Sequence, residues 1–538
     1  MVLDSGLEKK ADHLKILFYN WTDYQDPDQR GGGVSVYQKN LIEAATQCGD
    51  EVWFLSSGTA YSPFAWQPFI RELPKRRFVR RFEFVNSAIM SPGHLSFGQD
   101  VTASPVMEDR FSRFLSQYGP FDVVHFNNLE GIPVSFLRLA REHSKDARIV
   151  YSIHNYYAFC PQVNLWFQEK ASCRDFRDGR KCVNCLITQP AVRGLRWRYR
   201  VEYCLHRLGV SPYSSIGRFL RSLVLEPARV GYRAVKLGLQ ALSSSTSGAL
   251  PAARVATGER IGLLDGASAF ARRRQEFVAA LNRYADRILA VSARVAEIAE
   301  NHGVDPVKLS TLYIGTKFAA RAAASYGSRH EGKMMDEGMS GKMRSLRLVY
   351  LGYMRRDKGF YFFLDALTKM PASLARRLQL TFATKVSDPF SYARIKWMAH
   401  RFDSVTFYNG YTHTRLPQIL QGADLGVVPV LWEDNLPQVA IECVASGVPI
   451  LTSDRGGARE LLDCPALVFK AGSYSDFFAK IASVLQNPAL LGSALANRRT
   501  LYTPEQHYER LRSEVYRQPK VAPQDKHELM DYALTHAL

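Results

Sequence analysis

A strand, a loop, an amphipathic helix and a second strand follow one another in both halves of the sequence. In the first half, the strand LKILFYN precedes three glycines, the helix VSVYQKNLIEAATQCG and the strand EVWFLSS. In the second half, the order restarts at LRLVYLGYMRRDKGFYFFLDAL and continues through the strands LQLTFAT, SVTFYNG, ADLGVVPV and VPILTS. The last of these strands is followed by the loop DRGG and a predicted helix that starts near Ala458. This alternation is typical of βαβ units and parallel sheets. The sequence therefore predicts an α/β protein of two doubly wound, Rossmann-like domains that face a ligand-binding cleft.

Irregular polar stretches set the predicted domain boundaries. The N-terminal domain spans residues 1–320 and carries a basic, helical or irregular insertion at about 160–280. A linker follows at 321–345, where SYGSRHEGKMMDEGMSGKMRS is small and polar. The C-terminal domain spans 346–500, and residues 501–538 supply a last helix and a tail.

The net charge of +19 is concentrated in two basic clusters, one from Arg71 to Arg81 and one from Arg193 to Lys236. Either cluster is a solvated face or an anion-binding surface. Apolar residues alternate with arginines in FLRSLVLEPARVGYRAVKLGLQAL, which favours an interfacial segment on an anionic membrane surface. No recognition-helix or RNA-binding motif lies near either cluster, so no nucleic-acid partner is expected.

The N-terminal stretch MVLDSGLEKKADHLK is polar and mixed in charge, unlike a secretory signal. No apolar run reaches the roughly 18 residues of a membrane span. The 8 cysteines in 538 residues are too few for a disulfide scaffold, so reduced thiols are expected. We therefore expect a cytoplasmic protein, peripheral on the inner face of the membrane if the second basic cluster binds lipid.

Two carboxylates eight positions apart mark the stretch LWEDNLPQVAIEC, where Asp434 precedes a predicted helix and Glu442 lies inside it. Pro437 suits the first turn of that helix, with Asn435 or Leu436 at its start. The positive end of a helix can hold a phosphate, and a carboxylate can accept hydrogen bonds from a vicinal diol such as a ribose edge. The spacing suits a ligand with phosphates between a nucleoside and a sugar. A capped helix with solvated acids is the alternative.

The loop RRDKG places Lys358 before Gly359, with Arg355 and Arg356 beside it. Cations at a strand-to-helix turn can neutralise the charge that develops on a departing diphosphate. Solvated surface cations are the alternative. Catalysis of this kind is mostly electrostatic and needs no catalytic metal or cofactor.

Polar residues also follow strands of the first half. His125 and His154 end the strands FDVVHFNN and ARIVYSIHN, where ligands collect in parallel sheets, so both are site candidates. Ser292 is expected only to cap a helix. Three consecutive glycines before a helix allow a ligand to approach the backbone, with a plain flexible loop as the alternative: Gly31, Gly32 and Gly33.

Taken together, the sequence resembles the GT-B glycosyltransferases, particularly the large retaining family four, also called glycosyl transferases group 1. The matching stretches keep the family's order and cover most of the chain outside the two irregular regions. They are GGGVSVYQKNLIEA, DVVH, SIHN, ADRILAVS, LGYMRRDKG, ADLGVVPV, DNLPQVAIECVASGVPI and SDRGGARELL. The resemblance implies transfer, with retention, from a nucleotide-diphosphate sugar to a saccharide or lipid-linked acceptor, in polysaccharide or glycolipid assembly.

The resemblance also implies roles for individual residues. Lys358 and a nearby arginine would bind the diphosphate, and Glu442 would hold the ribose. Asp434 would contact the donor sugar, and His154 would lie beside the reacting sugar. The glycine loop would close over the donor or acceptor, and the helix in TPEQHYERLRSEVYR would cross back to the first domain. Further residues on the donor side would be Gly352, Asn435, Leu436, Gly456, Gly457 and Glu460.

Two positions depart from the family pattern. The family usually has Glu where this chain has Asp434, and Glu433 is one residue out of register. Aspartate is shorter by a methylene, so the choice of donor sugar would differ. The family's phosphate-binding arginine often follows the glycine directly, and Tyr353 stands there. Arg355 or Arg356 must then substitute.

Four cysteines fall within 26 residues and end in the knuckle KCVNC: Cys160, Cys173, Cys182 and Cys185. Four thiolates suit a structural zinc ion or an iron–sulfur cluster that pins a loop beside His154. Reduced thiols packed in a loop are the alternative. Two rival functions also stay open, a sugar-nucleotide epimerase on the same scaffold and a non-catalytic binding module with a metal knuckle.

Overall fold

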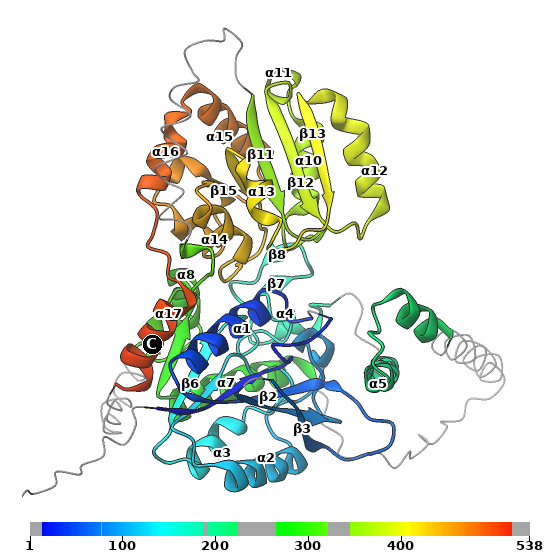
Figure 1. The fold of residues 1–538 in the computed structure, drawn as a ribbon, viewed down its shortest axis with the longest axis vertical. Coiled ribbons are helices and arrows are strands. Elements are labelled where there is room, and N and C mark those ends of the chain that lie inside the picture. The colour runs from blue at the N-terminus through cyan, green and yellow to red at the C-terminus, as the bar shows by residue number, and fades with distance from the viewer. Residues whose placement is uncertain are drawn as a thin grey trace, which may run out of the picture.

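The computed structural model describes residues 13–28, 30–76, 78–186, 192–223, 265–320 and 345–518. They form two α/β domains stacked along the long axis of the molecule (Figure 1). Most of the predicted linker at 321–345, and most of the amphipathic stretch that begins at Phe219, lie outside the described residues.

The described part of the first domain forms an eight-stranded sheet in the order β10-β9-β6-β5-β1-β2-β4-β3. Neighbouring strands are parallel except β3, which pairs antiparallel with β4. The strands are β1 (Lys15–Asn20), β2 (Glu51–Ala60), β3 (Phe69–Arg76), β4 (Val79–Val85), β5 (Val123–Phe126), β6 (Arg148–Ile153), β9 (Arg287–Ala290) and β10 (Leu309–Thr311). The helices that pack with it are α1 (Gly32–Gln47), α2 (Pro105–Tyr118), α3 (Phe136–His143), α7 (Gly266–Tyr284) and α8 (Ala293–Glu300).

The second domain, as far as residues 345–518 show it, has a six-stranded parallel sheet in the order β13-β12-β11-β14-β15-β16. Its strands are β11 (Leu346–Leu351), β12 (Leu378–Thr384), β13 (Ser404–Asn409), β14 (Leu425–Val428), β15 (Ile450–Ser453) and β16 (Val468–Phe469). Its helices are α10 (Phe360–Lys369), α11 (Ala372–Ala375), α12 (Pro389–Met398), α13 (Leu416–Gln421), α14 (Gln438–Ala445), α15 (Tyr474–Gln486) and α16 (Ala489–Ala496). The prediction of two doubly wound domains is confirmed.

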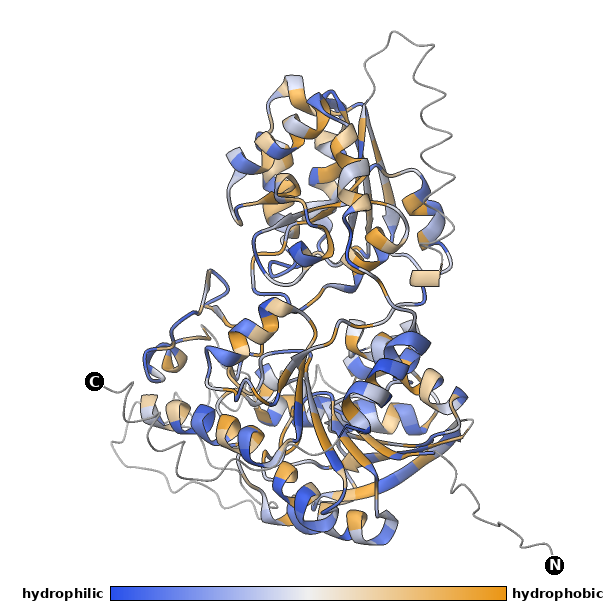
Figure 2. Ribbon diagram, turned by 90° about the vertical axis from the view of Figure 1, so that its left-hand side faces the viewer, coloured by the Kyte–Doolittle hydropathy of each residue, from blue (hydrophilic) through white to orange (hydrophobic). Residues whose placement is uncertain are grey.

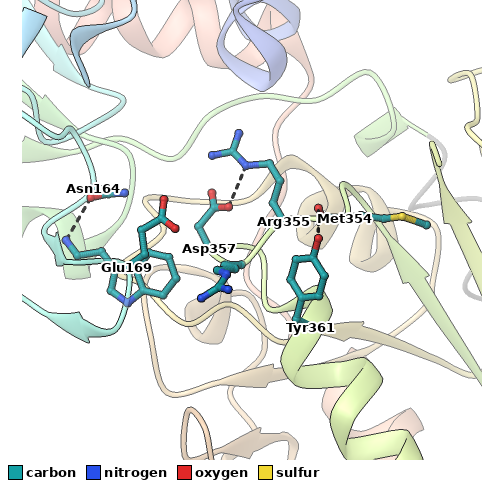
Figure 3. A pocket seen from close by; sticks show the side chains of 8 residues that line it. Asn164, Glu169, Met354, Arg355, Asp357 and Tyr361 are labelled. Carbon is teal, nitrogen blue, oxygen red and sulfur yellow. Dashed lines mark hydrogen bonds and ion pairs between the residues drawn. The ribbon is translucent and has the colours of Figure 1, made fainter. Parts of the chain in front are cut away.

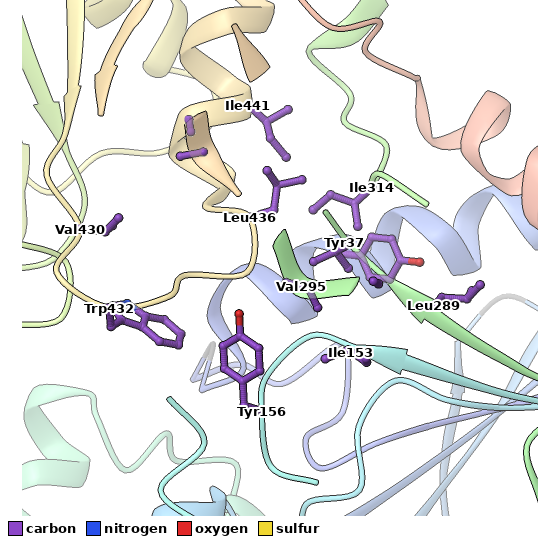
Figure 4. Packing of buried hydrophobic residues seen from close by; sticks show 14 of the residues in the cluster. Tyr37, Ile153, Tyr156, Leu289, Val295, Ile314, Val430, Trp432, Leu436 and Ile441 are labelled. Atoms are coloured by element: carbon purple, nitrogen blue, oxygen red, sulfur yellow. The ribbon is translucent and has the colours of Figure 1, made fainter. Parts of the chain in front are cut away.

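Apolar side chains from both domains meet between the sheets. Figure 2 shows hydrophobic residues running through the strands of each domain, and Figure 4 shows where the two groups join. The rings of Tyr156 and Trp432 meet edge-on at 6.4 Å between centroids, with Leu436 and Ile153 close by. Burial of such surface is worth about 25 cal/mol per Å², so these contacts stabilise the packing of the two domains against each other.

The chain ends against the first domain. The helix α17 (Pro504–Leu511) begins with a capping box between Thr503 and Gln506 and continues as a π turn, η6 (Arg512–Tyr516). His507 Nε2 lies 3.0 Å from the Tyr37 hydroxyl on α1. The Tyr516 hydroxyl lies 2.7 Å from His125 Nδ1 on β5. Residues beyond 500 therefore tie the second domain back to the first sheet.

Two features differ from the sequence predictions. The helix expected from Ala458 is a short 3-10 turn, η4 (Ala458–Leu461), because its side chain Glu460 is bonded to the first domain instead. The first basic cluster lies on the hairpin β3–β4, which the sequence analysis did not predict. In this cluster Arg71 pairs with Glu83. Arg80 pairs with Glu72, and Arg81 pairs with Asp23. Three cations of this cluster are therefore paired with acids.

The insertion lies beside the cleft and the first sheet. It contains a small hairpin of β7 (Trp166–Phe167) and β8 (Ala171–Ser172), the short helix α4 (Arg180–Val183) and α5 (Val192–Arg207). The hairpin reaches up to the second domain, and α5 stands to one side of the first (Figure 1).

Candidate active site

Lys358 and Asp434 come together at the strand ends of the second domain. Gly359 caps α10 with φ +71°, and a Cβ there would lie 1.6 Å from the Pro429 carbonyl oxygen, so the turn requires glycine. The turn holds Lys358 Nζ 2.6 Å from Asp434 Oδ2 and 5.4 Å from the centre of the Trp432 ring. A cation and an acid that the sequence separates by 76 positions thus form one pair.

The structure also distinguishes Asp434 from its acidic neighbour. Glu433 accepts two hydrogen bonds of 3.0 Å from Arg294 of the first domain, one of 3.2 Å from Arg455, and one of 3.1 Å from the Gly456 amide. Burial would raise the pKa of Glu433, but the Arg294 bonds and charge outweigh burial and lower it. Glu433 is therefore committed to the domain contact, and Asp434 is the acid that faces Lys358.

Glu442 lies on α14, which begins at Gln438 with Pro437 as its N-cap, one position after Leu436, the later of the two predicted starts. The side chain is buried, and burial raises its pKa to about 8. Its Oε1 lies 3.5 Å from His413 Nδ1. A buried carboxyl of this kind is a candidate for binding the hydroxyls of a ligand.

Two residues near Glu442 were missed by the sequence analysis. His413 is the first, since its Nδ1 faces the Glu442 carboxyl. Tyr411 is the second. Burial and then the charge on Glu442 raise the pKa of Tyr411, so its hydroxyl lies near that carboxyl. Tyr353, which occupies the family's arginine position, also contributes to that shift. Tyr411 and His413 follow the carboxyl end of β13, so the rule that ligands collect at strand ends was the signal available for them.

His154 ends β6 on the opposite side of the cleft. Its ring lies 4.7 Å from that of Tyr37, and its Nε2 has no hydrogen-bond partner among the described residues. Burial lowers its pKa to about 3, so the imidazole is neutral. Asn435 connects the two sides, because its Nδ2 donates to the Ile153 carbonyl oxygen at 3.3 Å. His125, in contrast, uses both ring nitrogens on Tyr516 and Ser152 and is structural.

The glycine loop brings the start of α1 against the start of α14. A Cβ on Gly33 would lie 2.9 Å from Gln438 Cγ, and Gly32 has φ +53°. A Cβ on Gly31 would lie 2.0 Å from Ser35 Oγ. Two positive helix ends therefore lie close together at the cleft, which favours an anion between them.

Gly456 and Gly457 support the acid loop from below. A Cβ on Gly456 would lie 2.1 Å from the Asp434 carbonyl oxygen, and one on Gly457 would lie 2.3 Å from that of Asn435. Ser292 caps α8 as predicted and also donates to the Asn435 carbonyl oxygen at 2.9 Å.

Glu460 completes this domain contact. Its carboxylate accepts from the Ala293 and Arg294 amides at 2.9 and 2.7 Å, the first free N–H groups of α8. The second domain therefore supplies a helix cap to the first, and the position of Asp434 depends on both.

Arg355 and Arg356 are exposed and face the insertion hairpin. Arg355 Nε donates to Asp357 Oδ1 at 2.9 Å. Both arginines line a cavity with Asn164, Trp166 and Glu169 (Figure 3). Gly352 precedes this loop with φ +140°. That Arg355 or Arg356 binds the diphosphate stays a prediction.

The four cysteines lie in the insertion, with Cys160, Cys182 and Cys185 buried. Burial raises the pKa of Cys182 and Cys185 to about 12, and Cys185 Sγ donates to Gln162 Oε1 at 2.9 Å. Within the described residues, no three His, Cys, Asp or Glu side chains are arranged to hold a metal ion. The metal hypothesis stays a prediction, to be tested by metal analysis.

Comparisons with known proteins agree with this geometry. Residues 345–487 match the family model described as glycosyl transferases group 1. No curated protein matches the sequence. The structure of an α,α-trehalose-phosphate synthase (UDP-forming) from Burkholderia xenovorans is similar with a TM-score of 0.51 at 13% identity, covering 93% of this chain and 100% of that one. Anabaena Alr3699/HepE in complex with UDP and glucose gives 0.50 at 12%, covering 94% and 100%. A glycosyltransferase from Rickettsia africae gives 0.50 at 12%, covering 94% and 98%.

At such identities the likeness establishes the fold, two Rossmann-like domains in the GT-B arrangement of glycosyltransferases. The family match, to the glycosyl transferases group 1, covers residues 345–487 of the second domain.

Proposed function

We propose that this glycosyltransferase moves a hexose from a nucleotide-diphosphate sugar to an acceptor hydroxyl, with retention at the anomeric carbon. One observation carries the proposal. Lys358, before α10, lies 2.6 Å from Asp434, and the next residue, Asn435, donates to the carbonyl oxygen of Ile153, the residue before His154. A cation, an acid and a neutral imidazole thus surround one part of the cleft.

The predicted roles follow from these positions. The diphosphate would lie between Lys358 and the facing ends of α1 and α14, where a cation and two helix ends stabilise the leaving charge. Arg355 or Arg356 would add a second cation. Glu442 would accept hydrogen bonds from the ribose, and Asp434 from the donor sugar. The buried, neutral His154 would donate or accept a hydrogen bond with the reacting sugar.

Uridine diphosphate sugars are the donors to test first, since the similar HepE structure holds UDP and the similar synthase is UDP-forming. The acceptor we favour is a saccharide or lipid-linked hydroxyl in polysaccharide or glycolipid assembly. The exposed basic and aromatic surface around α5 supports an acceptor at an anionic membrane.

The test is binding and slow hydrolysis of nucleotide sugars across a donor panel, with full-length wild type, Lys358→Ala and Glu442→Ala. We expect Lys358→Ala to lower hydrolysis by about 100- to 1000-fold, because it removes a cation from the developing charge. Glu442→Ala should weaken donor binding. Matched controls are Lys369→Ala, at the other end of α10, and Glu505→Ala on α17, which should behave as wild type.

The outcomes separate the rival functions. If no donor binds the wild type, the glycosyltransferase proposal fails and a binding module is favoured. Release of an epimerised nucleotide sugar, without transfer or hydrolysis, would instead identify an epimerase.

A further inference from the structure

A cavity of about 290 Å³ lies between the insertion hairpin and the second domain (Figure 3). Its first-domain wall is formed by three residues of one segment: Asn164, Trp166 and Glu169. Its second-domain wall is formed by four residues of the β11–α10 turn and one of α10: Met354, Arg355, Arg356, Asp357 and Tyr361. The cavity therefore bridges the two domains.

The first-domain wall is a strained segment that is tightly tied down. Val163, Leu165, Gln168 and Glu169 have φ of 67°, 50°, 52° and 54°, a conformation that costs non-glycine residues about 1 kcal/mol or more each. The Tyr156 amide donates to the Val163 carbonyl oxygen at 3.0 Å, which fixes the segment to the end of β6. The Trp166 backbone amide donates to Asn164 Oδ1 at 3.2 Å. The Nδ2 group of the Asn164 side chain can therefore donate to a ligand.

The second-domain wall belongs to the catalytic loop. Asp357 lies in the wall, accepts from Arg355, and its carbonyl oxygen accepts from the Leu431 amide at 3.2 Å. The next residue along the chain is Lys358, bonded to Asp434. Arg355 also helps to lower the pKa of His94 on η1 (Gly93–Ser96), after burial, which places a first-domain histidine near the same opening. A molecule in the cavity would thus lie next to the reacting centre.

The chemistry of the lining favours an uncharged sugar. Two guanidinium groups, on Arg355 and Arg356, are balanced by the carboxylates of Glu169 and Asp357. An indole, an amide and a phenol complete the wall, a mixture that suits hydroxyl groups and the face of a sugar ring. The volume is at the low end of ligand sites, which span about 300–1000 Å³, so one ring fits better than an extended chain.

We infer that this cavity is the acceptor subsite and that it takes a neutral pyranose, the terminal sugar of the acceptor. The inference rests on the proposed function, in which the insertion hairpin would bind the acceptor. Asn164 and Glu169 hydrogen-bond the ring hydroxyls from the first domain. The arginine of the pair Arg355 and Arg356 that does not bind the diphosphate does so from the second. The acceptor hydroxyl then points to the donor site beside Lys358.

The test uses full-length protein with UDP present and methyl pyranosides of glucose, galactose, mannose and rhamnose as probes. Binding is followed by saturation-transfer NMR and titration. Methyl glucuronate and glucose 6-phosphate serve as anionic comparisons. The variants are Asn164→Ala, Glu169→Gln and both together, with Glu505→Gln as an exposed control on α17. Hydrolysis of the donor is measured in each.

At least one neutral pyranoside should bind better than its anionic counterpart. The double variant should weaken its binding by about tenfold or more, because hydrogen bonds from an amide and to a carboxylate are lost. Donor hydrolysis should stay at the wild-type rate, which also shows that the variants fold. Three results would overturn the inference: no pyranoside binds, the variants bind as wild type, or the anionic probes bind more tightly. Intact donor hydrolysis in the wild type alongside any of these would leave the proposed function standing.

Discussion

At the scale of single residues, neighbours in the sequence have different roles because the fold turns them to different partners. Glu433 and Asp434 are both acidic and both buried, yet Glu433 pairs with Arg294 across the domain contact and Asp434 pairs with Lys358. The sequence shows two adjacent acids but not which of them has the role of the family's glutamate. Only the partners, 139 and 76 positions away, decide which acid faces the cleft.

The raised pKa of Glu442 predicts that nucleotide binding depends on pH. The free carboxyl, with a pKa of about 8, holds a proton at neutral pH, whereas hydrogen bonds from a diol stabilise the ionised form. Binding must then release a proton, so affinity should fall as pH drops below 8, by up to about tenfold per unit.

Calorimetric titration of UDP between pH 6 and pH 8.5, in buffers of different ionisation enthalpy, measures both the affinity and the proton release. Glu442→Gln carries no titrating group and should give a flat profile with weaker binding. A wild-type affinity that does not change with pH would show that the neutral carboxyl binds the ligand.

At the scale of elements, the parallel strands were predictable because each is a short apolar run that ends in polar residues, as in β5, β6 and β14. The hairpin β3–β4 was not, since its strands carry many arginines and resemble a basic surface. Those arginines are tolerated because Glu72, Glu83 and Asp23 neutralise them, and these contacts cannot be read from local sequence. The turn at Ala458 was mistaken for a helix because its bonds lead to α8.

The cysteine segment holds the hairpin that faces the second domain, so loosening it should affect both stability and catalysis. Cys182→Ser with Cys185→Ser places two hydroxyl groups in an apolar cluster with Phe97 and Phe270, which should lower the melting temperature by several degrees. Thermal unfolding of the double variant measures this.

Metal analysis of the purified protein separates the two interpretations of the cysteines. A stoichiometric metal in the wild type that is lost in the double variant would establish the structural metal. Metal-free wild type that unfolds at the same temperature with and without a chelator would establish packed thiols. Cys48→Ser with Cys204→Ser, both only half-buried, is the matched control.

At the scale of the whole molecule, the charge is distributed unequally among its surfaces. Three arginines of the first basic cluster are paired with acids. The helix α5 carries Arg193, Arg196, Arg198, Arg200 and Arg207. The acid on this helix, Glu202, pairs with both Arg198 and Arg221. Nearby, Phe64 and Trp66 are 82% and 62% exposed on the loop between β2 and β3. The Arg200 guanidinium lies 5.3 Å from the Trp66 ring, which joins the loop to the helix.

Arginines beside exposed aromatic rings suit the headgroup region of an anionic bilayer, where each cation adds about 1 kcal/mol and the rings enter the interface. Among the described residues no helix is long and apolar enough to cross a membrane, so this surface would act by attachment. We expect full-length protein to float with vesicles of phosphatidylcholine and phosphatidylglycerol, and to stay behind with phosphatidylcholine alone.

Phe64→Ser with Trp66→Ser should abolish flotation, because it removes the rings while the net charge is unchanged. The chain offers a matched control on the second domain, Phe390→Ser with Trp397→Ser, where the rings are 87% and 66% exposed on α12, away from the arginines of α5. That control should float as wild type does.

Equal loss in both pairs would mean that exposed rings act without regard to position, and absence of wild-type flotation would remove the membrane from the proposed function. Flotation by the control pair alone would fix the orientation of the enzyme, with the first domain on the lipid and the hairpin cavity next to it. A lipid-linked sugar could then reach the cleft directly from the membrane surface.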